Sequence, residues 1–128
     1  MNYLADTNIL IALFNKDMEI YNKIQKYGKI YISVVSLGEL YLGAYYSQKI
    51  NENLSKIKEH VSNCFIVHDL NDKTANFYGI IKANQKRIGK PIPDNDIWIT
   101  ATAMEHDLIL ISRDKHVLET TLIKTEKW

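Results

Sequence analysis

A helix and the strand that follows it decide the fold of this chain: Ile97-Trp98-Ile99-Thr100-Ala101-Thr102-Ala103-Met104 and then Leu108-Ile109-Leu110-Ile111-Ser112. The first stretch is apolar on nearly every side of a helix, which is typical of a helix enclosed in a protein interior. The second is a short run of Leu and Ile, the pattern of a strand buried on both faces. Together they predict a sheet of buried strands covered by helices.

The same alternation continues through the rest of the chain. Apolar residues recur at helical spacing in three more segments, Leu37–Tyr45, Leu54–Val61 and Thr74–Ile81. Four more short runs have the composition of buried strands: Tyr3–Ala5, Ile30–Ser33, Phe65–His68 and Leu122–Lys124. Strands that alternate with helices form βαβ units with right-handed crossovers. We therefore predict a single α/β domain over residues 1–128, with three α/β/α layers and a mainly parallel central sheet.

Composition excludes several classes of protein. The chain has 128 residues, 46% of them hydrophobic and 24% charged, as in a soluble globular domain. A single cysteine, Cys64, excludes an internal disulfide framework and a cysteine-based zinc site. The longest apolar run, Ile9–Phe14, is far shorter than the ~20 residues that span a bilayer. Because no basic segment precedes an apolar stretch at the N-terminus, a cytoplasmic protein is expected.

Acidic residues fall at the junctions between the expected strands and helices. They are Asp6 after the first strand, Glu39 one turn after the second, Asp114 after Leu108–Ser112, and Asp94 and Asp96 at the start of the buried helix. Ligands of open parallel sheets bind outside the carboxyl ends of the strands. We therefore expect these acids to converge on one pocket.

Helix capping is the alternative explanation for each acid taken alone. Ser36 and Glu39 have the spacing of a capping box, in which Glu39 bonds back to the backbone of Ser36. Asp94, Asp6 and Asp114 could each cap a helix. Capping does not require acids to face one another, however, and Ser, Thr or Asn would serve equally well. The concentration of acids near apolar segments therefore favours a shared cation, because an unpaired buried charge is very costly.

Oxygen ligands alone suit Mg²⁺ or Mn²⁺, whereas zinc prefers His or Cys. The net charge of +1 does not by itself indicate a nucleic-acid partner. If the five junction acids lie in one pocket, however, ten acids remain against 16 basic residues on the rest of the molecule. An acidic metal pocket in a basic surface is the layout expected of a metal-dependent nuclease. The candidates for RNA phosphate contacts flank the acids: Lys86, Arg87, Lys90, Arg113 and Lys115.

Four motifs, in order along the chain, resemble the PIN-domain family, and within it the VapC-type toxins of bacterial toxin–antitoxin pairs. They are Tyr3–Leu10 (YLADTNIL), Ser36–Leu40 (SLGEL), Pro91–Ile99 (PIPDNDIWI) and Ile111–Asp114 (ISRD). By this resemblance, Asp6, Glu39, Asp96 and Asp114 match the catalytic, metal-binding acids of the family. Asn8 matches the polar residue that supports the first acid, and Ser112 the Ser or Thr that accompanies the last. Asp94 is an extra acid and a further candidate ligand.

The resemblance implies a Mg²⁺- or Mn²⁺-dependent endoribonuclease that cuts tRNA, rRNA or mRNA with a metal-activated water. Toxins of this family are typically homodimers and are held inactive by a VapB-type antitoxin whose C-terminal segment covers the active site. Exposed apolar candidates for a dimer contact are Tyr45, Tyr46 and Trp128.

Two other classes remain as alternatives. A PIN-like module that binds RNA or protein without cleaving would have the same fold, although all four matching acids are present here. A phosphoacceptor receiver domain also has acids at strand ends. It would need adjacent acids after the first strand and a lysine after the last core strand, whereas this chain has a lone Asp6 and Ser112-Arg113-Asp114. The sequence contains no Gly-rich phosphate loop, so it does not favour a nucleotide-binding protein.

Overall fold

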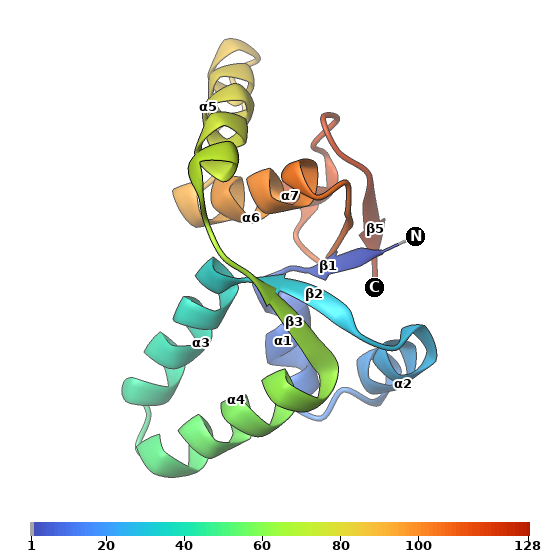
Figure 1. Ribbon diagram of the computed structural model, residues 1–128, viewed down its shortest axis with the longest axis vertical. Helices are drawn as coiled ribbons and strands as arrows, with labels where there is room; N and C mark the ends of the chain where they lie inside the picture. Colours follow the sequence, from blue (N-terminus) through green and yellow to red (C-terminus); the bar gives the residue numbers. More distant parts are fainter. Residues whose placement is uncertain (1) are drawn as a thin grey trace.

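The computed structural model describes residues 2–128 and contains one five-stranded sheet in that range (Figure 1). The strand order is β3-β2-β1-β4-β5, and every pair of neighbouring strands is parallel. The strands are β1 (Tyr3–Ala5), β2 (Ile30–Ser33), β3 (Phe65–His68), β4 (Ile109–Ser112) and β5 (Thr125–Lys127). The predicted parallel α/β architecture is confirmed.

Helices cover both faces of this sheet, with α1 to α4 on one side and α5 to α7 on the other (Figure 1). The helices on the first side are α1 (Thr7–Phe14), α2 (Met18–Tyr27), α3 (Val34–Tyr45) and α4 (Ile50–Cys64). Those on the second side are α5 (Asp72–Arg87), α6 (Asp94–Glu105) and α7 (Lys115–Leu118). No helix within residues 2–128 is both long and apolar enough to cross a membrane.

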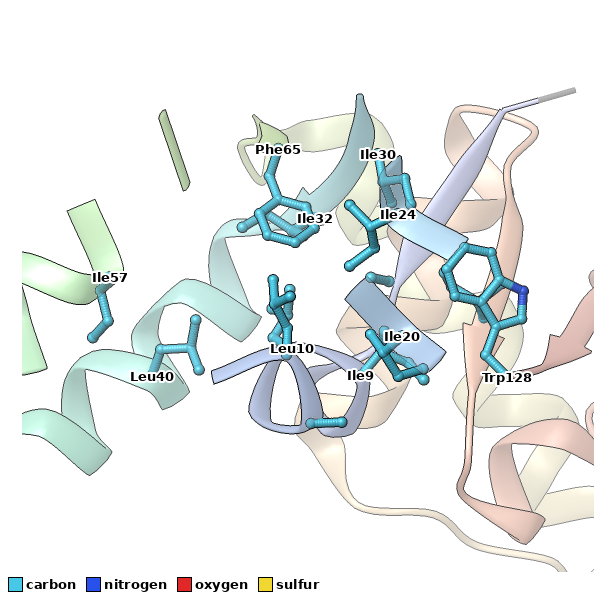
Figure 2. Close-up of a cluster of buried hydrophobic side chains, with 14 of the residues drawn as sticks. Ile9, Leu10, Ile20, Ile24, Ile30, Ile32, Leu40, Ile57, Phe65 and Trp128 are labelled. Carbon is cyan, nitrogen blue, oxygen red and sulfur yellow. The ribbon is translucent and has the colours of Figure 1, made fainter. Parts of the chain in front are cut away.

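Alternating side chains of the strands fill two separate cores. Ala5 and Ile111 face the α1–α4 side, where Figure 2 shows Leu10 of α1 among Ile32, Phe65 and Leu40. Leu4 and Leu110, one residue earlier on the same strands, pack instead against α6. The β1 and β4 strands are therefore buried on both faces and form the rigid centre of the sheet.

The apolar α6 helix is buried as its sequence predicts. Six of its twelve residues are buried: Ile97, Ile99, Thr100, Ala101, Thr102 and Ala103. The hydroxyls of Thr100 and Thr102 donate to the backbone carbonyls of Asp96 and Trp98, one turn earlier, at 2.7 and 2.9 Å. These bonds allow threonine to lie in an apolar layer without an unpaired donor.

The last strand lies three residues later than predicted. Leu122 and Ile123 are not in a strand, and their apolar side chains pack against the cores beside α6. The strand is Thr125–Lys127, at the edge of the sheet, where polar residues are tolerated because one side faces solvent. The prediction that Trp128 is exposed is also wrong: only 6% of its surface is exposed, and its ring packs on Tyr3 and Tyr27.

Candidate active site

Asp6 leaves the central strand β1 at the carboxyl edge of the sheet, beside the end of β4. The Ser112 hydroxyl donates to Asp6 Oδ2 (2.7 Å), and the Asp6 N–H donates to the carbonyl of Ile111 (2.9 Å). Asp6 Oδ1 accepts from the backbone N–H of Thr7 (2.8 Å), so Asp6 also caps α1. Burial raises the pKa of the Asp6 carboxyl above its ordinary value, while the hydrogen bonds from Ser112 and Thr7 partly oppose this rise.

Asn8 joins the ends of β1 and β4. Its Nδ2 donates to Ser112 Oγ (3.2 Å) and, at 3.4 Å, to Asp6 Oδ2. Its Oδ1 accepts from the backbone N–H of Arg113 (3.2 Å). The side chain therefore fixes the carboxylate of Asp6 against the turn after β4.

Asp114 follows that turn and is tied to the same serine. Its N–H donates to Ser112 Oγ (3.0 Å), so Ser112 contacts both the side chain of Asp6 and the backbone of Asp114. Asp114 Oδ1 accepts from the N–H groups of His116 (2.8 Å) and Val117 (3.3 Å) and caps α7. Asp6 and Asp114 therefore do cap helices, as the alternative explanation expects. Each cap uses only Oδ1, so Oδ2 of each carboxylate takes no part in capping.

Glu39 is held by hydroxyl groups that sequence reasoning did not place in the site. Thr7 Oγ1 lies 2.9 Å from Glu39 Oε1 and 2.9 Å from Ser36 Oγ. Since a hydroxyl carries one proton, Thr7 can donate to the carboxylate while it accepts from Ser36. Thr7 and Ser36 are both buried, so the Ser36–Thr7–Glu39 relay orients the carboxylate from inside the protein.

The capping box considered for Ser36 and Glu39 is wrong. The α3 helix begins at Val34, and its N-cap is Ser33, whose hydroxyl accepts from the N–H of Val35 (3.1 Å). Ser36 therefore lies in the first turn of the helix and is not its N-cap. Its hydroxyl is left to serve Thr7 and, through it, Glu39.

The charges of the other three acids act on Asp96. Burial, followed by the negative charges of Asp6, Asp114 and Glu39, raises the pKa of Asp96 to about 6. The four carboxylates come from β1, α3, α6 and the turn after β4, which are far apart in the sequence. None of the four forms an ion pair with a lysine, arginine or histidine in the part of the chain that the structure describes.

Asp94 does not join this group, against the expectation that it is a further ligand. Its Oδ1 accepts from Lys82 Nζ (2.6 Å) and from the Tyr78 hydroxyl (2.9 Å), both on α5, and these bonds lower the pKa of Asp94. The N-cap of α6 is Pro93, so Asp94 and Asp96 both lie in the first turn. Residues two apart on a helix point about 200° from each other, so only one of them faces the other acids.

A family model described as PIN domain matches residues 3–121. The chain belongs to the PIN-domain family. Among curated relatives it is 35% identical over 131 residues to Ribonuclease VapC2 of Haemophilus influenzae (strain ATCC 51907 / DSM 11121 / KW20 / Rd), covering 100% of this chain and 98% of the relative. It is 31% identical over 131 residues to the tRNA(fMet)-specific endonuclease VapC of Shigella flexneri, with the same coverage.

Solved structures of toxin–antitoxin complexes have the same fold as this PIN domain. One is VapBC2 from Rickettsia felis bound to a DNA fragment from their promoter, with a TM-score of 0.92, 28% identity and coverage of 100% of this chain and 99% of that one. Another is VapBC-1 from nontypeable Haemophilus influenzae, with a TM-score of 0.88, 26% identity and coverage of 100% and 98%.

The donor set of this PIN domain fits a hard divalent cation. All four acids offer oxygen, the ligand atom that Mg²⁺ and Mn²⁺ prefer. Within residues 2–128, no three His, Cys, Asp or Glu side chains are already gathered closely enough to hold a metal ion. Binding one cation with all four acids would therefore require their carboxylates to move closer together, and the cation would offset the repulsion between their charges.

The basic candidates for RNA contact fall into two groups. Arg113 is engaged within the protein: its Nε donates to the carbonyl of Trp128 (2.8 Å) and its Nη2 pairs with Asp17 (2.9 Å). This makes Arg113 a link between the chain end and α2, against its expected role in binding phosphate. The remaining candidates are exposed on α5, the α5–α6 connector and α7: Lys86, Arg87, Lys90 and Lys115.

Sequence reasoning did not include Thr7 and Ser36 among the site residues, and it considered Ser36 only as half of a capping box. A usable signal was present, since Ser36 lies one turn before Glu39 in a stripe that is otherwise apolar. A buried hydroxyl needs a hydrogen-bond partner, and the hydroxyls of Ser36 and Thr7 supply one for each other.

Proposed function

We propose that this PIN domain is the toxin of a type II toxin–antitoxin pair and acts as a Mg²⁺- or Mn²⁺-dependent endoribonuclease in the cytoplasm. The observation that carries the proposal is that Asp6, Glu39, Asp96 and Asp114 lie around one edge of the sheet, where Ser112 links Asp6 to Asp114 and Thr7 contacts Glu39, and that none of the four has a basic partner among residues 2–128. Relatives named as VapC ribonucleases over the full length of the chain support the same conclusion.

The four acids would hold the cation, which supplies an activated water and stabilises the negative charge that builds on the attacked phosphate. Hydrolysis would join the water oxygen to phosphorus, break the P–O3′ bond and transfer a proton from the water to the leaving oxygen, which gives a 5′-phosphate and a 3′-hydroxyl. The protein's own part is to orient the acids beforehand. Ser112 and Asn8 fix Asp6, the Thr7 hydroxyl fixes Glu39, and the α7 cap fixes Asp114.

Cleavage of a mixed pool of tRNA and other structured RNAs tests this activity. The pool includes tRNA because one relative is named as a tRNA(fMet)-specific endonuclease. We expect wild type to cleave with Mg²⁺ or Mn²⁺, to stop in EDTA, and to lose activity as Asp96→Asn. Asp94→Asn is the matched control and is expected to keep activity, because Asp94 pairs with Lys82.

Intact RNA under every metal condition, from folded protein, would favour the second candidate, a PIN-like module that binds without cleaving. Cleavage that persists in Asp96→Asn would instead remove Asp96 from the proposed site.

A groove beside Glu39 supports an antitoxin partner. This groove is a cavity of about 300 Å³ between α1, α3 and α4, and its apolar walls include Ile11, Phe14 and Leu40. Glu39 forms part of the wall, so a protein segment that filled the groove would also contact Glu39. We propose that a VapB-type antitoxin contributes this segment, with apolar side chains in the groove and a basic residue facing the carboxylates.

Substitution of Ile11 tests the antitoxin contact separately from cleavage. Ile11 lines the groove and is 48% exposed, so Ile11→Asp should fold, cleave RNA and resist inhibition by the cognate antitoxin. Ile80→Asp is the control, because Ile80 is 45% exposed on α5, away from the groove. Equal inhibition of both variants would contradict the proposed contact.

We also propose a homodimer, which rests on the family resemblance and on exposed aromatic side chains. Tyr45 and Tyr46, at the end of α3, are both exposed. Light scattering after gel filtration should report twice the mass of 14.9 kDa. A monomer across a wide concentration range would remove the dimer from the proposal.

A further inference from the structure

A second cavity, of about 390 Å³, lies between the α5–α6 connector and α7 and has no role in the site described above. One wall is formed by Ile88, Lys90 and Pro91 of the connector, and the opposite wall includes His116 and Glu119. The volume is within the range of small-ligand sites. The cavity therefore has room for one nucleotide.

Both walls of this cavity belong to segments that carry acids of the candidate site. The connector leads directly into α6, where Asp96 lies in the first turn. The α7 helix begins directly after Asp114, and the N–H of His116 donates to the Asp114 carboxylate. The cavity therefore lies beside the segments that carry Asp96 and Asp114.

The connector wall is fixed in place by Gln85, which is buried. Gln85 Nε2 donates to the carbonyl of Lys90 (2.8 Å), and the Lys90 N–H donates to the carbonyl of Gln85 (3.0 Å). The turn between them contains Gly89 at φ +69°, a conformation that other residues rarely adopt. Gln85 thus holds the peptide of Lys90 on both sides, and the cavity is formed before any ligand binds.

We propose that this cavity binds one unpaired nucleotide of the RNA, next to the bond that is cut; the inference rests on the proposed nuclease function. The base packs between the apolar wall of Ile88 and Pro91 and the imidazole of His116. Proteins commonly recognise bases of single-stranded RNA by such stacking and edge contacts. Lys90 pairs with a phosphate, and Lys86, Arg87 and Lys115 add positive charge around the cavity.

Glu119 gives the cavity a preference among bases. A carboxylate accepts hydrogen bonds and cannot donate them at neutral pH. It can therefore accept from the exocyclic amino group of adenine, cytosine or guanine, whereas uracil offers only its N3–H, which lies between two carbonyl oxygens that repel a carboxylate. The cavity is thus expected to disfavour uridine at the nucleotide that it holds.

Fluorescence polarisation with labelled single-stranded RNA tests this inference in EDTA, where cleavage is prevented. The probes are decamers of adenosine, cytidine and uridine of equal length and charge. Wild type should bind the adenosine and cytidine probes about fivefold more tightly than the uridine probe, within the range for a single base contact. Glu119→Ala should remove this preference.

Two further variants separate the base from the phosphate. Ile88→Ala should weaken binding to the adenosine and cytidine probes and leave the salt dependence unchanged. Lys90→Ala should weaken binding to every probe and reduce the slope of log K against log salt by about 0.7, the value for one phosphate contact on a single strand. Lys58→Ala, on the exposed face of α4, is the control and should bind as wild type.

The outcomes distinguish this inference from the nuclease proposal. If wild type cleaves RNA but Glu119→Ala keeps the probe preference and Ile88→Ala binds the probes as tightly as wild type, the cavity is not a nucleotide site and the nuclease proposal stands. If wild type cleaves nothing while Glu119→Ala loses the preference and Ile88→Ala binds more weakly, the nuclease proposal fails and the cavity remains an RNA site. Equal binding of all probes by wild type overturns the inference.

Discussion

Replacing Asp96 by asparagine should make the metal-free protein more stable while it removes activity. Asp96 carries a negative charge that is half-buried among three other carboxylates, and these surroundings raise its pKa from 3.8 to about 6. A shift of about 2 units corresponds to about 3 kcal/mol if it is taken in full. Because the side chain is partly exposed, solvent screens much of this interaction, and about 1–2 kcal/mol is the better expectation.

Thermal unfolding in EDTA at pH 8, where the Asp96 carboxylate is charged, measures this gain. For a domain of this size, about 1–2 kcal/mol raises Tm by about 3–8 °C. Saturating Mg²⁺ or Mn²⁺ should narrow or reverse the difference, because a cation that binds only the folded wild type stabilises it. Asp94→Asn is the matched control and should show no gain, because it loses the ion pair with Lys82.

The reasoning is refuted if Asp96→Asn unfolds at the same temperature as wild type, or lower, in EDTA. It is also refuted if Asp94→Asn gives an equal gain, since the effect would then come from reduced negative charge in general and not from crowding of the four acids.

Three further predictions concern other parts of the molecule. Thr7→Val should raise the metal concentration required for half-maximal cleavage by at least about tenfold, because it removes the hydroxyl that orients Glu39, whereas Thr7→Ser should restore wild-type behaviour in the same titration. The hydrogen bond from Arg113 lowers the pKa of the Asp17 carboxyl. The ionised carboxyl therefore stabilises the fold above the unfolded-state pKa, and this stabilisation is lost as pH falls through the lowered pKa. Asp17→Asn should accordingly make Tm depend less on pH on the acid side of a plot of Tm against pH. Trp128→Ala should lower the free energy of unfolding by about 3 kcal/mol in urea titrations, because it removes a buried ring that packs against Tyr3 and Tyr27.

The sheet centre and α6 could be predicted from sequence because their burial appears directly in residue type. The edge strand could not be found in this way. Its residues, Thr125–Lys127, are polar, whereas the apolar pair Leu122 and Ile123 fills the cores from a loop. Apolar runs report burial, and burial identifies a strand only where the strand lies in the middle of a sheet.

The candidate site could be predicted as far as its position in the sheet, because parallel strands end at a common edge. The partners of each acid could not, since they come from distant parts of the chain. Thr7 meets Glu39 from 32 residues away, and Arg113 reaches Asp17 across 96. The helical spacing of Asp94 and Asp96 implied that the two side chains face different directions. Without the exact start of α6, however, the sequence did not show which of them faces the other acids.

The strand order has a consequence for the synthesis of this protein on the ribosome. The first strand to be made, β1, lies between β2 and β4, and β4 begins only at Ile109. Asp6 therefore emerges early but meets Ser112 and Asp114 only when most of the chain has been translated. A nascent or prematurely terminated chain that stops before β4 lacks one acid and the serine that fixes another. The cluster of four acids is therefore completed only after β4 and the turn that follows it have been synthesised.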